Sequence, residues 1–313
     1  MNSLVSIIVI SYNSSEYIIE TLESIRLQTY YNIELIISDD GSSDTTLQIC
    51  RQWIEENKDR FINTELISVP ENTGIPANCN RGLLASHGEW FKLIAGDDLL
   101  DQSCIKENIG YVNLHPICDV VISKYQIFDS TFHPENFAGI RPPDDMLGFF
   151  EMEPEEQLRF MRFRSEHLIL GMMVRTKTLR SVGGFDESYR LFEDLPLLIN
   201  LLNSGNRFFF LPKVTAYYRR NVRTVSNQST RIYKILLKEM LKAYKKLRRP
   251  FLKLTEKIHV DLYFINEYIL VYFFHGESTR FYLLIKRLLY QMSPIQHKMR
   301  LELKQNLKNS RTI

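Results

Sequence analysis

Apolar and polar residues alternate in blocks along the first third of the chain, and the blocks predict strands and helices in turn. Short apolar runs rich in β-branched residues are typical of strands buried on both faces; they occur at residues 4–10, 33–38, 64–69 and 90–94. Between them, apolar residues recur at helical spacing over 16–28, 45–57 and 77–86. This alternation predicts a mostly parallel sheet with right-handed crossovers, an α/β fold.

The later pattern is less regular and changes character near residue 230. We predict, in order, a helix at 101–114, a strand at 119–123, a long surface loop at 130–154, a helix at 155–164, a strand at 168–174, a helix at 195–203 and paired strands at 207–211 and 214–218. Long amphipathic helices then follow at 232–247, 258–274 and 281–292. The pattern therefore predicts an α/β domain over residues 1–229 and a helical region over 230–313.

Charge separates the same two regions. The 313 residues carry a formal net charge of +2, but residues 1–229 carry −10 and residues 230–313 carry +12. The four cysteines lie far apart, which predicts reduced thiols rather than a zinc or dithiol site. The amino terminus lacks the features of a signal peptide, and the apolar stretch 258–275 is interrupted by Asp261, Asn266 and Glu267. We expect a cytoplasmic protein that does not span a membrane.

Acidic pairs follow the ends of predicted elements. Asp39-Asp40-Gly41-Ser42 comes after the second strand, Gly96-Asp97-Asp98 after the fourth, and Glu193-Asp194 before the helix at 195–203. Ligands of open α/β sheets bind at the carboxyl ends of the strands. There, carboxylates can accept from a nucleoside, ligate a hard cation or take a proton. The same residues also suit a turn, a helix cap and a helix-dipole partner, so each pair has a purely structural explanation.

Taken in order, the motifs resemble the family 2 glycosyltransferases over roughly residues 4–226. The resemblance rests on Ser11-Tyr12-Asn13, Asp39 to Asp44, Asn72-Thr73-Gly74, Asn80-Arg81-Gly82, Gly96-Asp97-Asp98, Gly183-Gly184-Phe185-Asp186, Glu193-Asp194 and Tyr218-Arg219-Arg220. It implies the GT-A fold, a Rossmann-like, mostly parallel sheet with flanking helices. It also implies inverting transfer from a nucleotide sugar, expected to be a UDP-sugar, to a hydroxyl of a glycan or lipid-linked oligosaccharide in O-antigen or capsule synthesis.

The resemblance also implies a role for individual residues. Asp194 would be the general base, with Glu193 beside it. The nucleobase would be bordered by Tyr12, with Ser11 and Asn13 in the same loop, and Asp40 would accept from the uracil ring NH, with Arg81 near the base or phosphates. Asp97 would face the ribose, Asp98 would bind Mn²⁺ or Mg²⁺, and Arg219 and Arg220 would cover the diphosphate. Many relatives carry a histidine where this chain has Asn221, so Arg223 is expected to neutralise phosphate instead. His167 is either structural or part of an acceptor pocket.

The basic C-terminal region has two explanations that the sequence leaves open. Its amphipathic helices could lie on the anionic inner face of the plasma membrane, beside a lipid-linked acceptor. Alternatively, their apolar side packs on the catalytic domain or on a second subunit, as in a homodimer. Two other functions fit less well. A nucleotidyltransferase would carry a Gly-rich basic loop after the first strand, and a nucleic-acid-binding protein is disfavoured by the acidic front part.

Overall fold

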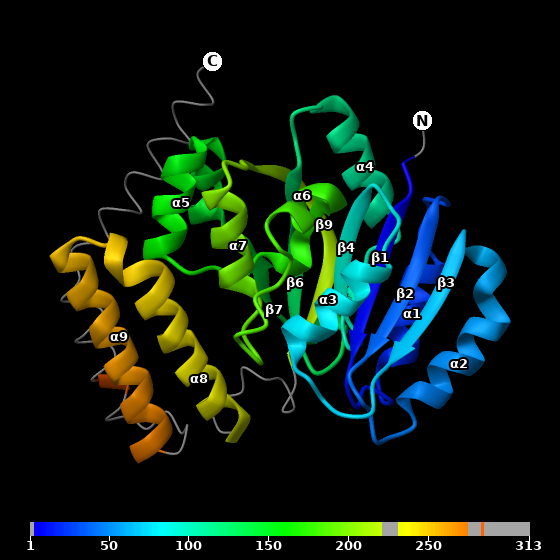
Figure 1. The fold of residues 1–313 in the computed structure, drawn as a ribbon, viewed down its shortest axis with the longest axis horizontal. Coiled ribbons are helices and arrows are strands. Elements are labelled where there is room, and N and C mark those ends of the chain that lie inside the picture. Colours follow the sequence, from blue (N-terminus) through cyan, green and yellow to red (C-terminus); the bar gives the residue numbers. More distant parts are fainter. Residues whose placement is uncertain (1–2, 221–230, 275–282, 285–313) are drawn as a thin grey trace. The chain divides into compact units, whose positions relative to one another are not determined.

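The computed structural model describes residues 3–220, 231–274 and 283–284 (Figure 1). The chain divides into two compact units. The first comprises Met1–Pro142 and His167–Arg220, and the second comprises Pro143–Glu166 and Asn221–Ile313. The segment 143–166 therefore belongs with the C-terminal helices, although the sequence pattern predicted a single boundary near residue 230.

Four parallel strands form one side of the sheet in the first unit, in the order β3-β2-β1-β4 (Figure 1). They are β1 (Val5–Ser11), β2 (Ile33–Asp39), β3 (Asn63–Ser68) and β4 (Trp90–Ala95), connected by α1 (Ile18–Arg26), α2 (Thr46–Asn57) and α3 (Ile75–Ala85). β2 is buried at every position, as its continuous apolar run predicted. The predicted strand, helix, strand alternation is thus confirmed for this half of the sheet.

The other half of the sheet is mixed. β8 (Met172–Arg175) runs antiparallel to both β4 and β6 (Val120–Asp129), while β9 (Phe208–Arg220) runs parallel to β6. The short strands β5 (Leu99–Leu100) and β7 (Phe137–Arg141) pair antiparallel with β9 and β6. The remaining helices of this unit are α4 (Cys104–Leu114), α6 (Thr176–Ser181) and α7 (Asp194–Asn203).

Two sequence predictions for residues after 129 were wrong. The paired strands expected at 207–211 and 214–218 are a single strand, β9, because Pro212 and Lys213 lie where its register with β6 shifts between Ser123 and Lys124. A bulge tolerates the proline, which has no N–H for the ladder. The expected loop 130–154 contains β7 and two 3₁₀ segments, Pro134–Asn136 and Asp144–Glu151.

The second unit is helical in its described part. It contains α5 (Pro154–Phe163), α8 (Arg231–Ala243), a π-helical turn (Tyr244–Arg248), a 3₁₀ turn (Arg249–Phe251) and α9 (Leu254–Phe273). Arg248 is buried and donates to the carbonyls of Arg162, at 2.6 Å, and Phe163, which end α5. Burial lowers the pKa of Arg248 to about 10. This arginine therefore links α5 to the C-terminal helices.

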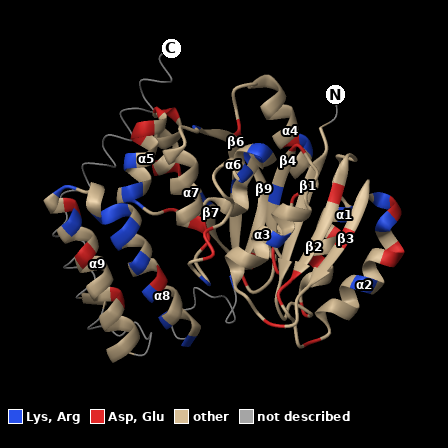
Figure 2. Cartoon of the chain, viewed as in Figure 1, with Lys and Arg blue, Asp and Glu red and all other residues tan. Residues whose placement is uncertain are grey.

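Lysine and arginine residues recur along α8 of this unit (Figure 2). No helix within the described ranges combines the length and apolarity required to cross a membrane. Of the helix predicted at 281–292, only residues 283–284 fall within the described part of the chain.

Candidate active site at the carboxyl edge of the sheet

The register of the parallel strands brings their carboxyl ends to one level. Ser11 at the end of β1 pairs with Asp39 of β2, which pairs with Ser68 of β3, and Ile10 pairs with Ala95 of β4. β2 and β4 lie on opposite sides of β1, so the strand order reverses there. Such a reversal is where ligands bind in open α/β sheets. The loops that carry Tyr12, Asp40 and Asp97-Asp98 start from this edge, whereas Arg81 lies on α3 and Arg219 and Arg220 end β9.

The loops after β1 and β2 are tied together by short polar side chains. Ser11 Oγ donates to Asp39 Oδ2 at 2.9 Å, and the Asn13 backbone N–H donates to Ser42 Oγ at 2.8 Å. Asn13 has a φ of 52°, a conformation that asparagine tolerates better than most residues. The Tyr12 side chain between them is 50% exposed. Ser11 and Asn13 therefore fix the loop, and Tyr12 presents its ring to solvent.

Asp40 is the centre of a second cluster. Its carboxylate accepts from the Thr73 N–H at 3.0 Å, the Thr73 hydroxyl at 2.6 Å, the Gly74 N–H at 2.8 Å and the Arg81 guanidinium at 2.6 Å. Burial raises the pKa of Asp40, but the hydrogen bonds from Thr73, Arg81 and Gly74 outweigh it and leave the pKa lowered. The Asp40 side chain is only 3% exposed. Asp40 and Arg81 are thus each other's partners and hold the loop after β3.

Asp97 and Asp98 follow β4 and share one arginine. The backbone N–H of Arg219 donates to Asp98 Oδ1 at 2.8 Å, and its Nε donates to the Asp97 carbonyl at 2.8 Å. The rest of the guanidinium pairs with Glu20 and donates to the Ser130 carbonyl at 2.7 Å. Arg219 is 2% exposed, so it supports the acidic pair from the buried side.

The aspartate pair suits a divalent cation that is also held by substrate phosphate. Among the described residues, Asp98 Oδ2 receives no hydrogen bond, and no group of three or more His, Cys, Asp or Glu side chains could hold a metal alone. Mg²⁺ is commonly held by one or two carboxylates with phosphate oxygens and water. Burial raises the pKa of Asp98, and the charge of Asp97 raises it further, although Arg219 opposes both. A bound cation would stabilise the ionised form of Asp98, so Asp97 and Asp98 fit a divalent cation.

Asp194 is the first residue of α7, and Glu193 is its N-cap. The Nδ1 atom of His167 lies 2.8 Å from Asp194 Oδ2. The side chain of Asp194 is 17% exposed and that of His167 67%. A carboxylate at a helix N-terminus is electrostatically favoured, and one that remains partly accessible can also take a proton from a bound hydroxyl.

The carboxylates after β4 and at the start of α7 affect the pKa values of buried neighbouring groups. Burial raises the pKa of Tyr125, and the charges of Asp194 and Asp98 raise it further, so both carboxylates lie within electrostatic range of one phenol. Burial likewise raises the pKa of Cys79 on α3, with added contributions from Glu193 and Asp194. Glu193 and Asp194 are therefore within electrostatic range of α3, and Asp194 and Asp98 are both within electrostatic range of Tyr125.

Arg220 differs from its neighbour Arg219. Its guanidinium forms a two-point ion pair with Asp129, at 2.6 Å and 3.0 Å, and its side chain is 54% exposed. It can therefore exchange its partner for an anion at modest cost. Asn221 and Arg223, for which the sequence suggested a phosphate role, lie outside the described residues.

Two buried polar residues near the site were not predicted. Lys92, in the middle of β4, is fully buried and donates to the carbonyls of Leu170 and Met172. Tyr125 donates to the His167 carbonyl at 2.9 Å. A single lysine inside an apolar strand was the available signal for Lys92. Tyr125 was missed because the strand at 119–123 was predicted too short.

Comparison with known proteins agrees with the resemblance to the family 2 glycosyltransferases. Residues 6–185 match the family described as Glycosyl transferase family 2. The glycosyltransferase GlyG of Streptococcus pneumoniae is 33% identical over 133 residues, which are 42% of this chain and 42% of GlyG. The chain thus matches less than half the length of this relative.

Solved structures share the fold at low sequence identity. S. aureus TarS (residues 1–349), in complex with UDP-GlcNAc, superposes with a TM-score of 0.59 at 19% identity, covering 88% of this chain and 76% of residues 1–349 of TarS. The mannosyltransferase PcManGT from Pyrobaculum calidifontis, in complex with GDP-Man and Mn²⁺, gives 0.57 at 18% identity, covering 98% and 86%. Both neighbours are GT-A glycosyltransferases, and the expected GT-A fold is confirmed.

Proposed function

Because the chain belongs to glycosyl transferase family 2, we propose that it transfers a sugar, with inversion, from a UDP-sugar to a hydroxyl of a glycan or lipid-linked acceptor. The observation that carries this proposal is that Asp40 and Asp97-Asp98 follow β2 and β4 at the carboxyl edge of the sheet, and that Asp194, in the same unit, acts electrostatically on the same phenol, Tyr125, as Asp98. TarS in complex with UDP-GlcNAc and PcManGT in complex with GDP-Man and Mn²⁺ support a nucleotide-sugar donor.

The donor base would lie beside the loops after β1 and β2. The half-exposed ring of Tyr12 offers a stacking surface. Asp40 would recognise the uracil NH, but its carboxylate already accepts from Thr73, Gly74 and Arg81. The base would therefore exchange with one of these donors; Thr73 is exposed and the Arg81 side chain is 18% exposed, whereas Gly74 is buried.

The diphosphate would lie over the aspartates after β4. Asp98, with Asp97 beside it toward the ribose, would hold Mn²⁺ or Mg²⁺, and the cation would neutralise charge on the departing nucleoside diphosphate. Arg220 is the accessible cation for the phosphates, and Arg219 fixes the backbone of the aspartate loop. In this scheme the two arginines have different roles.

Asp194 would act as the general base. Its carboxylate takes the proton of the acceptor hydroxyl while the hydroxyl oxygen forms a bond to the anomeric carbon. The bond from that carbon to the diphosphate oxygen breaks, and the nucleoside diphosphate leaves with the electron pair. Attack opposite the leaving group inverts the anomeric centre. Glu193 keeps the start of α7 acidic beside the base.

A donor screen tests the reaction. We expect nucleoside diphosphate release with a UDP-sugar, and stimulation by glycan or lipid-linked acceptors. Asp194→Asn should lower the transfer rate by about 10²-fold to 10⁴-fold and leave UDP binding intact, because only the proton acceptor is removed. The matched control is Asp59→Asn, which changes an exposed aspartate in the turn Lys58–Arg60. Transfer by Asp194→Asn at the rate of this control would refute the assignment.

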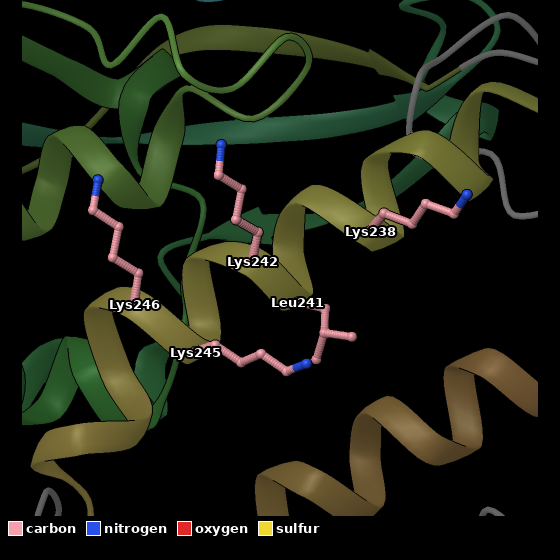
Figure 3. Close-up of a pocket in the computed structure, with 5 residues that line it drawn as sticks. All are labelled: Lys238, Leu241, Lys242, Lys245 and Lys246. Atoms are coloured by element: carbon pink, nitrogen blue, oxygen red, sulfur yellow. The ribbon is translucent and has the colours of Figure 1, made fainter.

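The basic surface of α8 and of the π-helical turn that follows it supports a second part of the proposal, contact with an anionic membrane. Lys238, Lys242, Lys245 and Lys246 line, with Leu241, an open hollow of about 460 Å³ (Figure 3). Each lysine near an anionic bilayer contributes about 1 kcal/mol of attraction. Such contact would bring the enzyme to a lipid-linked acceptor at the inner face of the plasma membrane. A second subunit on this helix is the alternative.

Vesicle sedimentation separates these alternatives. The wild type should pellet with phosphatidylglycerol vesicles at low salt and remain in solution with phosphatidylcholine vesicles. Substitution of the four lysines by glutamine should abolish the difference. Equal sedimentation with both lipids, together with a dimer that the substitutions dissociate, would favour the subunit contact.

A further inference from the structure

His167 is an exposed histidine on a rigid backbone. Four carbonyls in the segment 167–172 accept from buried side chains of neighbouring strands: Tyr125 Oη donates to His167 at 2.9 Å, Ser123 Oγ to Gly171 at 2.8 Å, and Lys92 Nζ to Met172 at 3.1 Å as well as to Leu170. Lys92 and Ser123 are fully buried. A segment held in this way cannot shift without leaving buried polar groups unpaired.

The close approach at Gly171 restricts the segment further. A Cβ at this glycine would lie 2.2 Å from the Ser123 carbonyl oxygen, so β6 and the residues after His167 are in direct backbone contact. The His167 side chain is 67% exposed, but its backbone is fixed by these contacts. The fixed backbone limits the positions that the imidazole can reach.

The imidazole reaches the proposed base. His167 Nδ1 lies 2.8 Å from Asp194 Oδ2. An ionised carboxylate can only accept, so the shared proton belongs to Nδ1. One oxygen of Asp194 is thereby occupied, and Oδ1 is left to face a substrate hydroxyl.

We infer that His167 is a positioning residue for the transfer reaction: its Nδ1–H holds Asp194 Oδ2 so that the other carboxylate oxygen is aimed at the acceptor hydroxyl. This inference rests on the proposed function, in which Asp194 is the base. No bond to His167 forms or breaks during transfer; the acceptor proton moves to Asp194. Because a displacement of about 1 Å can cost about 10²-fold in rate, a fixed hydrogen bond to the base has a measurable effect.

Three variants of His167 test the inference in the full-length protein. His167→Leu removes the donor and should lower kcat by about tenfold to 100-fold with little change in KM for the donor sugar. His167→Asn places an amide N–H near the position of Nδ1 and should retain most of the rate. His167→Ala should lose rate and recover part of it when imidazole is added, because the site is open to solvent. Calorimetric binding of UDP should be the same in all three, which verifies folding.

His87→Leu is the matched control. His87 is also exposed, and its Nδ1 lies 3.3 Å from a carboxylate, Glu34, but that pair is at the opposite edge of the sheet, where β2 and β4 begin. Its transfer rate should equal that of the wild type.

The outcomes are distinct. Wild-type rates in His167→Leu, or equal losses in His167→Asn and His167→Leu without imidazole rescue of His167→Ala, would overturn the positioning role while leaving the proposed transfer standing. Absence of turnover by the wild type with every nucleotide sugar would overturn the proposed function, and the role of His167 with it.

Discussion

Replacing Asp40 by asparagine should destabilise the first unit substantially. The variant keeps the shape of the side chain but exchanges one carboxylate oxygen for an NH₂ group. Either orientation points this group at existing donors, because Oδ1 accepts from the Thr73 hydroxyl and Arg81, and Oδ2 accepts from the Gly74 N–H. The substitution therefore creates a donor facing a donor and leaves Arg81 without its carboxylate.

The magnitude follows from burial. The Asp40 side chain is 3% exposed, and removing one partner of a buried pair costs about 3 to 5 kcal/mol. Asparagine retains one acceptor, so we expect a loss of about 2 to 4 kcal/mol in the free energy of unfolding. For a domain of this size each kcal/mol lowers Tm by about 2 to 4 °C. The expected decrease in Tm is therefore about 4 to 16 °C, measurable by calorimetry or circular dichroism.

Asp44→Asn is the control for this prediction. Asp44 lies in the same loop and accepts from the Thr46 N–H at 3.0 Å, the Thr46 hydroxyl at 2.5 Å and the Ser15 N–H at 3.2 Å, but it is exposed. The same change of charge there should cost about 1 kcal/mol, as is typical for an exposed residue that caps a helix start. Equal melting temperatures for the two variants would refute the claim that Asp40 is a buried structural hub.

The pH dependence gives a second test of the same residue. The folded pKa of Asp40 is lowered, so the unfolded state binds more protons as the solution is acidified. The stability that Asp40 contributes is present above its unfolded pKa of about 3.9 and is lost as the pH falls through the folded value. The difference in Tm between the wild type and Asp40→Asn should thus be constant near neutral pH and shrink in acid.

Two further predictions concern the arginines and the thiols. Arg219→Gln should lower both Tm and metal-dependent UDP affinity, because this buried side chain supports the aspartate loop. Arg220 is half-exposed, so Arg220→Gln should weaken UDP binding with little change in Tm. Thermal melting and UDP titration of both variants test this difference, and equal effects on Tm would contradict it. All four cysteines are free and buried, and burial raises the pKa of Cys50 and Cys118 to about 12. A thiol reagent at pH 8 should therefore react slowly with the native protein and quickly with four thiols in guanidinium; rapid native labelling would contradict the burial.

The parallel half of the sheet was predictable from sequence because its signals are local. β1 and β2 are short apolar runs rich in β-branched residues, and this composition identifies them as strands without knowledge of their partners. Parallel strands joined by right-handed crossovers have their carboxyl ends at the same edge of the sheet. The loops after Ser11, Asp39 and Ala95 therefore lie close together. The strand ends identified the acidic pairs after β2 and β4 as candidates, whereas the roles of the individual donor residues came from the resemblance to the family 2 glycosyltransferases.

The mixed half of the sheet was less predictable because its signals are not local. Pro212 reads as a turn in sequence, and only the pairing of β9 with β6 turns it into a bulge. The second unit combines segments 143–166 and the C-terminal helices through Arg248, a contact across more than eighty residues of sequence. The pairing of His167 with Asp194 likewise depends on tertiary structure.

The most direct test of the account is a calorimetric titration of UDP into the wild type and into Asp98→Asn, each with and without Mn²⁺. The variant keeps one oxygen for the N–H of Arg219, but it loses the charge of the carboxylate and replaces the second oxygen, the one available to a cation, with an NH₂ group. We expect UDP to bind the wild type more tightly with Mn²⁺ than without it, and the metal-dependent part to be lost in Asp98→Asn. UDP affinity that is unaffected by Mn²⁺ in both proteins, or absence of UDP binding to the wild type, would contradict the proposed donor site.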